Sequence, residues 1–110
     1  MTQVLRYAAF TDDPRGGNPA GVVLDATGLD DSQMQRIAAE VGFSETAFLI
    51  ESESAPGTFD VRYFAPSSEV PFCGHATIAS GVALRHRRGD GRYFFRTKAG
   101  EVEVEASVDV

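Results

Sequence analysis

Residues 67–81 read SSEVPFCGHATIASG, and this stretch is the most informative part of the sequence. Pro71 and Gly74 mark a tight passage from an extended segment into a helix, and the small residues after Gly74 allow other elements to approach closely. Because the backbone amides of Gly74, His75 and Ala76 would lie in the first turn, they have no intrahelical acceptor and are available to hold a carboxylate. Many helices begin at glycine without binding a ligand, so the pattern alone leaves open whether this helix start is a binding site.

Two helices and six strands are predicted around this stretch. The helix that starts near Gly74 is expected to end at residues 85–89 (RHRRG), where cations complement the negative end of the helix dipole. An earlier helix is indicated by a capping-box pattern at Asp30 and Gln33, apolar residues at helical spacing and a stop at Gly42. Strands are predicted at residues 3–10, 20–25, 44–50, 58–64, 92–97 and 101–106, the last four forming two hairpins. The order ββαββαββ predicts an α+β fold of one sheet with helices.

Length and composition suit one compact domain over residues 1–110, with 43% hydrophobic and 24% charged residues. A net charge of −6 argues against nucleic acid and anionic membrane surfaces as partners. Cys73 is the single cysteine, so no internal disulfide forms, and we see no Cys/His spacing typical of a metal site and expect no metal. Without a signal-peptide pattern or a membrane-length apolar run, we expect a cytoplasmic protein.

Three segments carry a resemblance to a known family. They are GGNPAGVV at residues 16–23, GFSETAFL at 42–49 and PFCGHATIASG at 71–81. In this order and spacing they resemble signatures of the PhzF-like phenazine-biosynthesis family. The resemblance implies a diaminopimelate-epimerase-like fold, with a mixed or antiparallel sheet wrapped around a central helix. Family members are more than twice as long and have two similar domains facing across a cleft, so the chain resembles the N-terminal half alone.

The resemblance also implies a reaction and its residues. It points to a cofactor-independent isomerase or epimerase that moves a proton on a small carboxylated amino or hydroxy substrate, with Glu45 as catalytic acid/base. Ser44 is expected to support it with a hydrogen bond, and Gly74 and His75 map onto the family's substrate-binding helix start. A second acid comes from the other domain in the family, so we expect a complementary second domain or a homodimer.

The residues themselves leave alternatives open. Glu45 lies among apolar strand residues and is either a solvated neighbour or a functional group in a cleft, where poor solvation raises the pKa of a carboxylate. His75 is a packed or capping residue when considered without the resemblance. Cys73 is expected near the substrate, and we interpret it first as a packing residue. A reactive thiol is the second interpretation, because diaminopimelate epimerases carry a reactive cysteine at the matching position. Asn18 is equally a turn residue and a substrate contact.

Two other functions compete with the isomerase. The chain is alternatively a non-catalytic subunit that binds small anions or other proteins, since it lacks the family's second acid. A third interpretation is that the chain is a fragment of a full-length enzyme.

Overall fold

The computed structural model describes residues 4–9, 18–42 and 45–106. In chain order the elements are β1 (Leu5–Ala9), β2 (Asn18–Val23), α1 (Asp31–Val41), β3 (Glu45–Glu51), β4 (Thr58–Phe64), β5 (Glu69–Val70), α2 (Gly74–Arg88), β6 (Gly91–Thr97) and β7 (Gly100–Ala106). The predicted α+β class is confirmed. Two details differ: the two-residue strand β5 adds a strand to the predicted order, and β2 starts at Asn18 because its ladder with β1 extends to the Ala9–Asn18 pair.

The strands form one mixed sheet in the order β1-β2-β3-β4-β6-β7, with β5 paired to β4. Neighbours are antiparallel except for β2–β3 and β4–β6, which are parallel. Each parallel pair is joined through a helix, because a parallel connection must cross from one end of the sheet to the other. Both predicted hairpins, β3–β4 and β6–β7, are confirmed.

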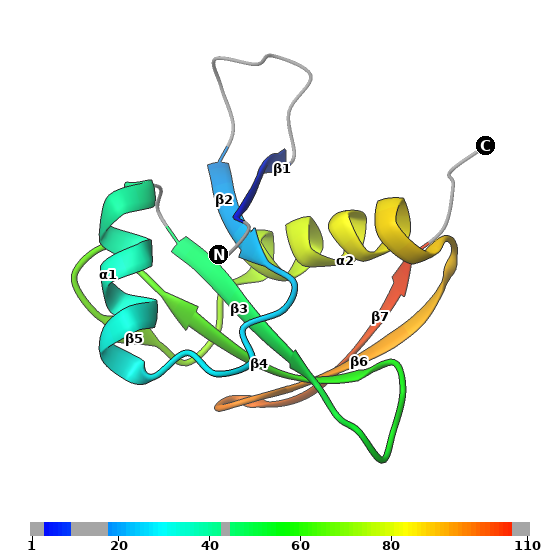
Figure 1. Ribbon diagram of the computed structural model, residues 1–110. Coiled ribbons are helices and arrows are strands. Elements are labelled where there is room, and N and C mark those ends of the chain that lie inside the picture. Colours follow the sequence, from blue (N-terminus) through cyan, green and yellow to red (C-terminus); the bar gives the residue numbers. More distant parts are fainter. Residues whose placement is uncertain (1–3, 10–17, 43–44, 107–110) are drawn as a thin grey trace.

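The sheet curls around α2. This helix packs against β1, β2 and β3 near one edge of the sheet and against β7 at the other (Figure 1). Small residues allow this: Ala76, Ala79 and Ala83 are buried, and a Cβ built on Gly81 would lie 2.8 Å from Val104 Cγ1. The predicted sheet around a central helix is therefore present, and its cause is the run of small side chains on α2.

The two helices cover opposite faces of the sheet. Along β3, Ala47 and Leu49 join the cluster beneath α2, whereas Phe48 joins the cluster beneath α1. This alternation follows from the two-residue period of a strand and leaves the middle of β3 buried on both faces. At the start of α1, the predicted capping box is formed by Asp30 and Gln33.

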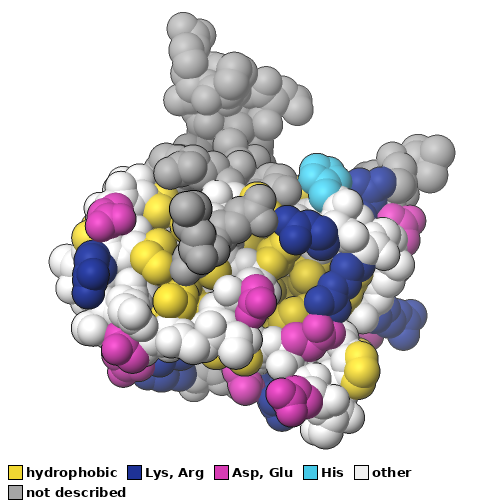
Figure 2. Space-filling view, in the orientation of Figure 1, with side chains coloured by type: hydrophobic (Ala, Val, Ile, Leu, Met, Phe, Trp, Pro, Cys, Tyr) yellow, Lys and Arg dark blue, Asp and Glu magenta, His cyan; other side chains and the backbone are white. Residues whose placement is uncertain are grey.

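The face shown in Figure 2 carries acidic and basic side chains interspersed, with hydrophobic side chains showing between them. Four large hydrophobic residues are exposed among the described residues: Phe72, Ile78, Val82 and Phe94. Within the part of the chain that the structure describes, neither helix is long and apolar enough to cross a membrane.

Candidate active site

The start of β3 and the start of α2 meet at one end of the sheet. Glu45 is the first residue of β3, and Cys73 is the N-cap of α2, with His75 in the first turn. The Cys73 thiol donates a hydrogen bond to Glu45 Oε1 over 3.0 Å. His75 Nε2 lies 3.6 Å from the same carboxylate oxygen and 3.7 Å from Cys73 Sγ. We call these three side chains the Glu45 cluster.

The Glu45 cluster is only partly shielded from solvent. Cys73 is 7% exposed, while the side chains of Glu45 and His75 are 21% and 17% exposed. A Cβ built on Gly74 would meet no atom within 4 Å, so the first residue of α2 borders open space. Among the described residues, the carboxylate and the helix start are therefore both partly open to solvent.

Burial decides the protonation state of the thiol. Burial, and after it the hydrogen bond to the Glu45 carboxylate, raises the pKa of Cys73 to about 11, although the backbone amides of Ala76 and His75 act in the opposite direction. A cysteine at a helix N-terminus often has a lowered pKa, but here desolvation and the neighbouring carboxylate outweigh the helix amides. Cys73 is therefore a neutral thiol that donates to Glu45.

A buried hydrogen-bond chain fixes the first turn of α2 to β4. Thr77 Oγ1 donates to the Cys73 carbonyl oxygen over 2.8 Å, and the Tyr63 hydroxyl lies 2.6 Å from Thr77 Oγ1. Because the Thr77 proton is used on the carbonyl, Tyr63 is the donor to Thr77. The exposed Phe72 packs edge-on against the Tyr63 ring at 5.6 Å between centroids. The sequence patterns did not single out these positioning residues, although Thr77 lies one helical turn after Cys73.

The structure gives less information on the other two expected site residues, Ser44 and Asn18. Ser44 lies outside the described residues. Asn18 begins β2, two positions before Ala20, which pairs with Glu45, but the Asn18 side chain is not among those described. The structure thus brings together Glu45, Cys73 and His75, with Gly74 between the last two.

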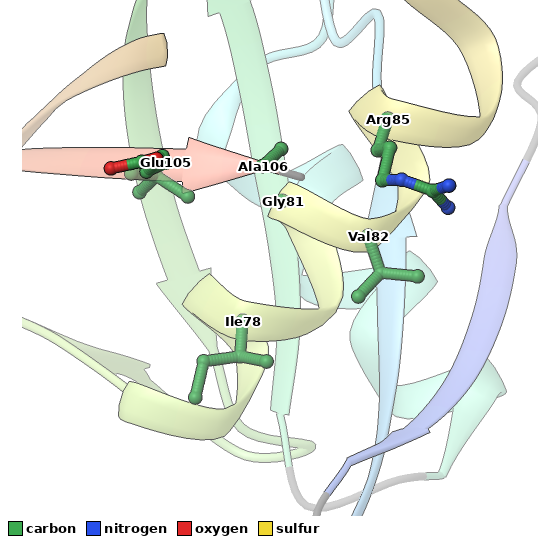
Figure 3. A pocket seen from close by; sticks show the side chains of 7 residues that line it. Ile78, Gly81, Val82, Arg85, Glu105 and Ala106 are labelled. Atoms are coloured by element: carbon green, nitrogen blue, oxygen red, sulfur yellow. The ribbon is translucent and has the colours of Figure 1, made fainter. Parts of the chain in front are cut away.

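A separate shallow groove lies further along α2. Figure 3 shows Ile78, Val82 and Arg85 on successive turns of α2, with Glu105 and Ala106 of β7 beside them. Gly81 and Val104 complete the lining. The groove shares no residue with the Glu45 cluster, and its apolar lining includes the exposed Ile78 and Val82.

Several solved structures share this fold. The PhzF-family phenazine biosynthesis protein of Bacillus anthracis has a TM-score of 0.83 and 45% identity, over 96% of this chain and 36% of that chain. A predicted epimerase of Pseudomonas aeruginosa, PA4716, has a TM-score of 0.90 and 27% identity, over 99% of this chain and 39% of that chain. The fold is therefore that of the PhzF-type, epimerase-like proteins.

The chain belongs to the family described as phenazine biosynthesis-like proteins (PhzC-PhzF), whose model matches residues 7–110. The uncharacterized isomerase YfhB of Bacillus subtilis is 45% identical over 108 residues, which are 96% of this chain and 36% of that protein. The uncharacterized isomerase YddE of Salmonella typhimurium is 55% identical over 78 residues, 71% of this chain and 26% of that protein. The resemblance seen in the sequence is confirmed, and the matched residues cover only 36% and 26% of the length of these two relatives.

Proposed function

We propose that the chain contributes the proton-transfer site of an isomerase that acts on a small carboxylated amino or hydroxy compound. The observation that carries this proposal is the Glu45 cluster, in which an accessible carboxylate lies against a thiol and an imidazole at a helix N-terminus. Relatives named as isomerases and a neighbour named as an epimerase support the reaction class. Proton transfer between carbons needs only a positioned acid/base and stabilisation of the charge that develops, so the proposal includes no cofactor.

Each residue has a role in this proposal. Glu45 accepts the proton from a substrate carbon and returns it. The Cys73 thiol holds Oε1 of that carboxylate in place, which directs Oε2 toward the substrate. The amides of Gly74 and His75 bind the substrate carboxylate at the positive end of the α2 dipole.

Three further side chains complete the assignment. The His75 imidazole donates a hydrogen bond to the substrate beside the reacting carbon. Ser44 and Asn18 are assigned as additional substrate contacts, because Ser44 directly precedes Glu45 and Asn18 lies in the strand paired with β3.

The proposal also requires protein on the far side of the substrate. Where the reaction inverts the configuration of the substrate carbon, a second group must deliver or remove a proton on the face that Glu45 does not reach. We assign this group to a complementary domain, for which the additional length of the relatives leaves room, or to a second copy of this chain. In the second case two Glu45 carboxylates face one cavity, and their mutual repulsion favours a shared proton.

The proposed reaction is tested by solvent-deuterium incorporation. The 110-residue chain is incubated in D2O with a panel of small amino and hydroxy acids, and exchange at carbon is followed by NMR. We expect Glu45→Gln to lose at least about a hundred-fold in exchange rate, the usual contribution of a general acid/base. Cys73→Ala is expected to stay within about ten-fold, and Glu101→Gln, an exposed change on β7, serves as the matched control.

Other outcomes favour other functions. Loss of exchange only in Cys73→Ala would move the chemistry from the carboxylate to the thiol. Carboxylate-induced shifts of the Gly74–Ala76 amide signals without any exchange would favour a small-anion-binding subunit. A strictly monomeric mass in light scattering at micromolar concentration would exclude the second copy as the partner.

A further inference from the structure

The Glu45 cluster contains three kinds of metal-binding atom. The thiol sulfur of Cys73, the imidazole nitrogen of His75 and a carboxylate oxygen of Glu45 lie within 4.8 Å of one another. The thiol and the imidazole come from the N-terminal end of α2, and the carboxylate comes from the start of β3. Two packed elements thus hold the three atoms together without a metal ion.

The distances between these atoms fit a zinc ion. Sγ and Oε1 are 3.0 Å apart, Sγ and Nε2 are 3.7 Å apart, and Oε1 and Nε2 are 3.6 Å apart. A point equidistant from all three is about 2 Å from each, close to zinc bond lengths of about 2.0–2.3 Å. In a tetrahedral zinc site those bond lengths separate the ligand atoms by about 3.3–3.6 Å. The two distances to Nε2 are close to these values, and Sγ and Oε1 need to move apart by about 0.5 Å when the ion replaces the thiol proton between them.

The donor set selects the kind of cation. Sulfur and imidazole ligands favour borderline-soft ions such as Zn2+, whereas Ca2+ and Mg2+ prefer sites made of oxygen atoms. The negative charges of a thiolate and a carboxylate together neutralise a divalent ion, which lowers the cost of holding it in a partly buried place. The fourth corner points away from the protein ligands and suits water or a ligand carboxylate.

We propose that Glu45, Cys73 and His75 form a Zn2+ site. On binding, a Zn–S bond replaces the S–H bond of Cys73, and the proton passes to the buffer. Zinc binding itself is independent of the proposed isomerase. Its consequence rests on the proposed function: a zinc ion occupies the Glu45 carboxylate and so inhibits proton transfer.

The site is tested with Co2+, which replaces Zn2+ and reports its ligands by absorption. The untagged chain is freed of metal with a chelator and titrated with Co2+. We expect one ion per chain, the strong visible bands of tetrahedral cobalt and a near-ultraviolet thiolate-to-cobalt band, all removed by adding Zn2+. Cys73→Ala abolishes the thiolate band, and Glu45→Gln and His75→Ala weaken binding at least ten-fold. His86→Gln, an exposed change at the other end of α2, leaves binding unchanged.

Defined results would overturn the proposal. Co2+ bound without a thiolate band, or bound by Cys73→Ala within three-fold of the unaltered chain, would show that these side chains are not the ligands. Circular dichroism of each variant separates loss of a ligand from loss of the fold. If zinc binds but no deuterium exchange is found, the metal site stands and the proposed isomerase fails. If exchange continues at saturating Zn2+, the inhibitory role fails.

Discussion

Glu69 gives the structure a measurable dependence on pH. Its carboxylate accepts two hydrogen bonds from Arg62, each of 2.8 Å, and a third of 2.8 Å from Lys98. Arg62 also donates to Asp31 in the first turn of α1. Glu69 lies in β5, just before the short segment that leads to Cys73 in the Glu45 cluster. This ion network therefore helps to hold that segment in place.

The size of the effect follows from the pKa. Hydrogen bonds from Arg62, and secondarily from Lys98, lower the pKa of Glu69 from 4.5 to about 2. Since the pKa is lower in the folded protein, the stabilisation is complete above pH 4.5 and is lost as the pH falls toward 2. The full shift corresponds to about 3 kcal/mol, of which about 2 kcal/mol disappears between pH 6 and pH 3. Solvent screening reduces the measurable loss to about 1–2 kcal/mol, because the side chains of Glu69 and Arg62 are 19% and 27% exposed.

The measurement is urea unfolding of the unaltered chain and of Glu69→Gln at several pH values between 3 and 7. At pH 6 the variant is expected to be less stable than the unaltered chain, and this difference shrinks by about 1–2 kcal/mol between pH 6 and pH 3. It does not reach zero at pH 3, because the folded pKa of Glu69 is about 2. The variant Glu51→Gln is measured alongside, and its stability difference is expected to depend on pH in the same way. Glu51 also has its pKa lowered to about 2, through the Arg88 guanidinium, but it lies away from β5.

The reasoning fails if the stability difference between Glu69→Gln and the unaltered chain is the same at pH 3 as at pH 6. A constant difference would mean that the glutamate contributes through packing rather than through its charge. Glu101→Gln, a change at an exposed glutamate, corrects for the removal of one negative charge from an acidic chain.

Three other substitutions probe the packing around the site. Tyr63→Phe removes the donor to Thr77 and should cost about 1 kcal/mol in urea unfolding, whereas an unchanged stability would contradict the hydrogen-bond chain. Gly81→Ala places a Cβ 2.8 Å from Val104 and should cost about 1–3 kcal/mol, and Val104→Ala added to it should recover part of that loss. Thr46→Val should raise the melting temperature, because the buried Thr46 hydroxyl has no hydrogen-bond partner among the described residues; a loss of about 1 kcal/mol would indicate a partner.

Local patterns predicted the elements well. The capping box at Asp30 and Gln33 and the stop at Gly42 place α1 correctly, because helix caps are contacts between residues near in sequence. The two hairpins follow from alternating strands joined by turns. The short strand β5 was missed, since two residues are too few to show a period.

The long-range arrangement could not be predicted from those patterns. The parallel pairs β2–β3 and β4–β6 depend on how α1 and α2 cross the sheet. The hydrophobic periodicity of a strand does not show which other strand will pair with it. The Glu45 cluster illustrates the same limit. Glu45 is 28 positions before Cys73, so the sequence predicted no metal-ligand spacing, although the folded chain brings the two side chains to 3.0 Å.

The exposure of the Glu45 cluster determines what the site needs in order to work. Proton abstraction from carbon becomes easier when water is excluded, because the charges that develop are then stabilised by fixed groups of the protein. The Glu45 side chain remains 21% exposed beside the open helix start, so a substrate held as proposed would keep one side in solvent. Covering that side with a further domain or a second copy would strengthen every interaction with Glu45. If the isomerase proposal is right, exchange should therefore rise with the covering protein, while zinc affinity should change far less, because all three zinc ligands come from this chain.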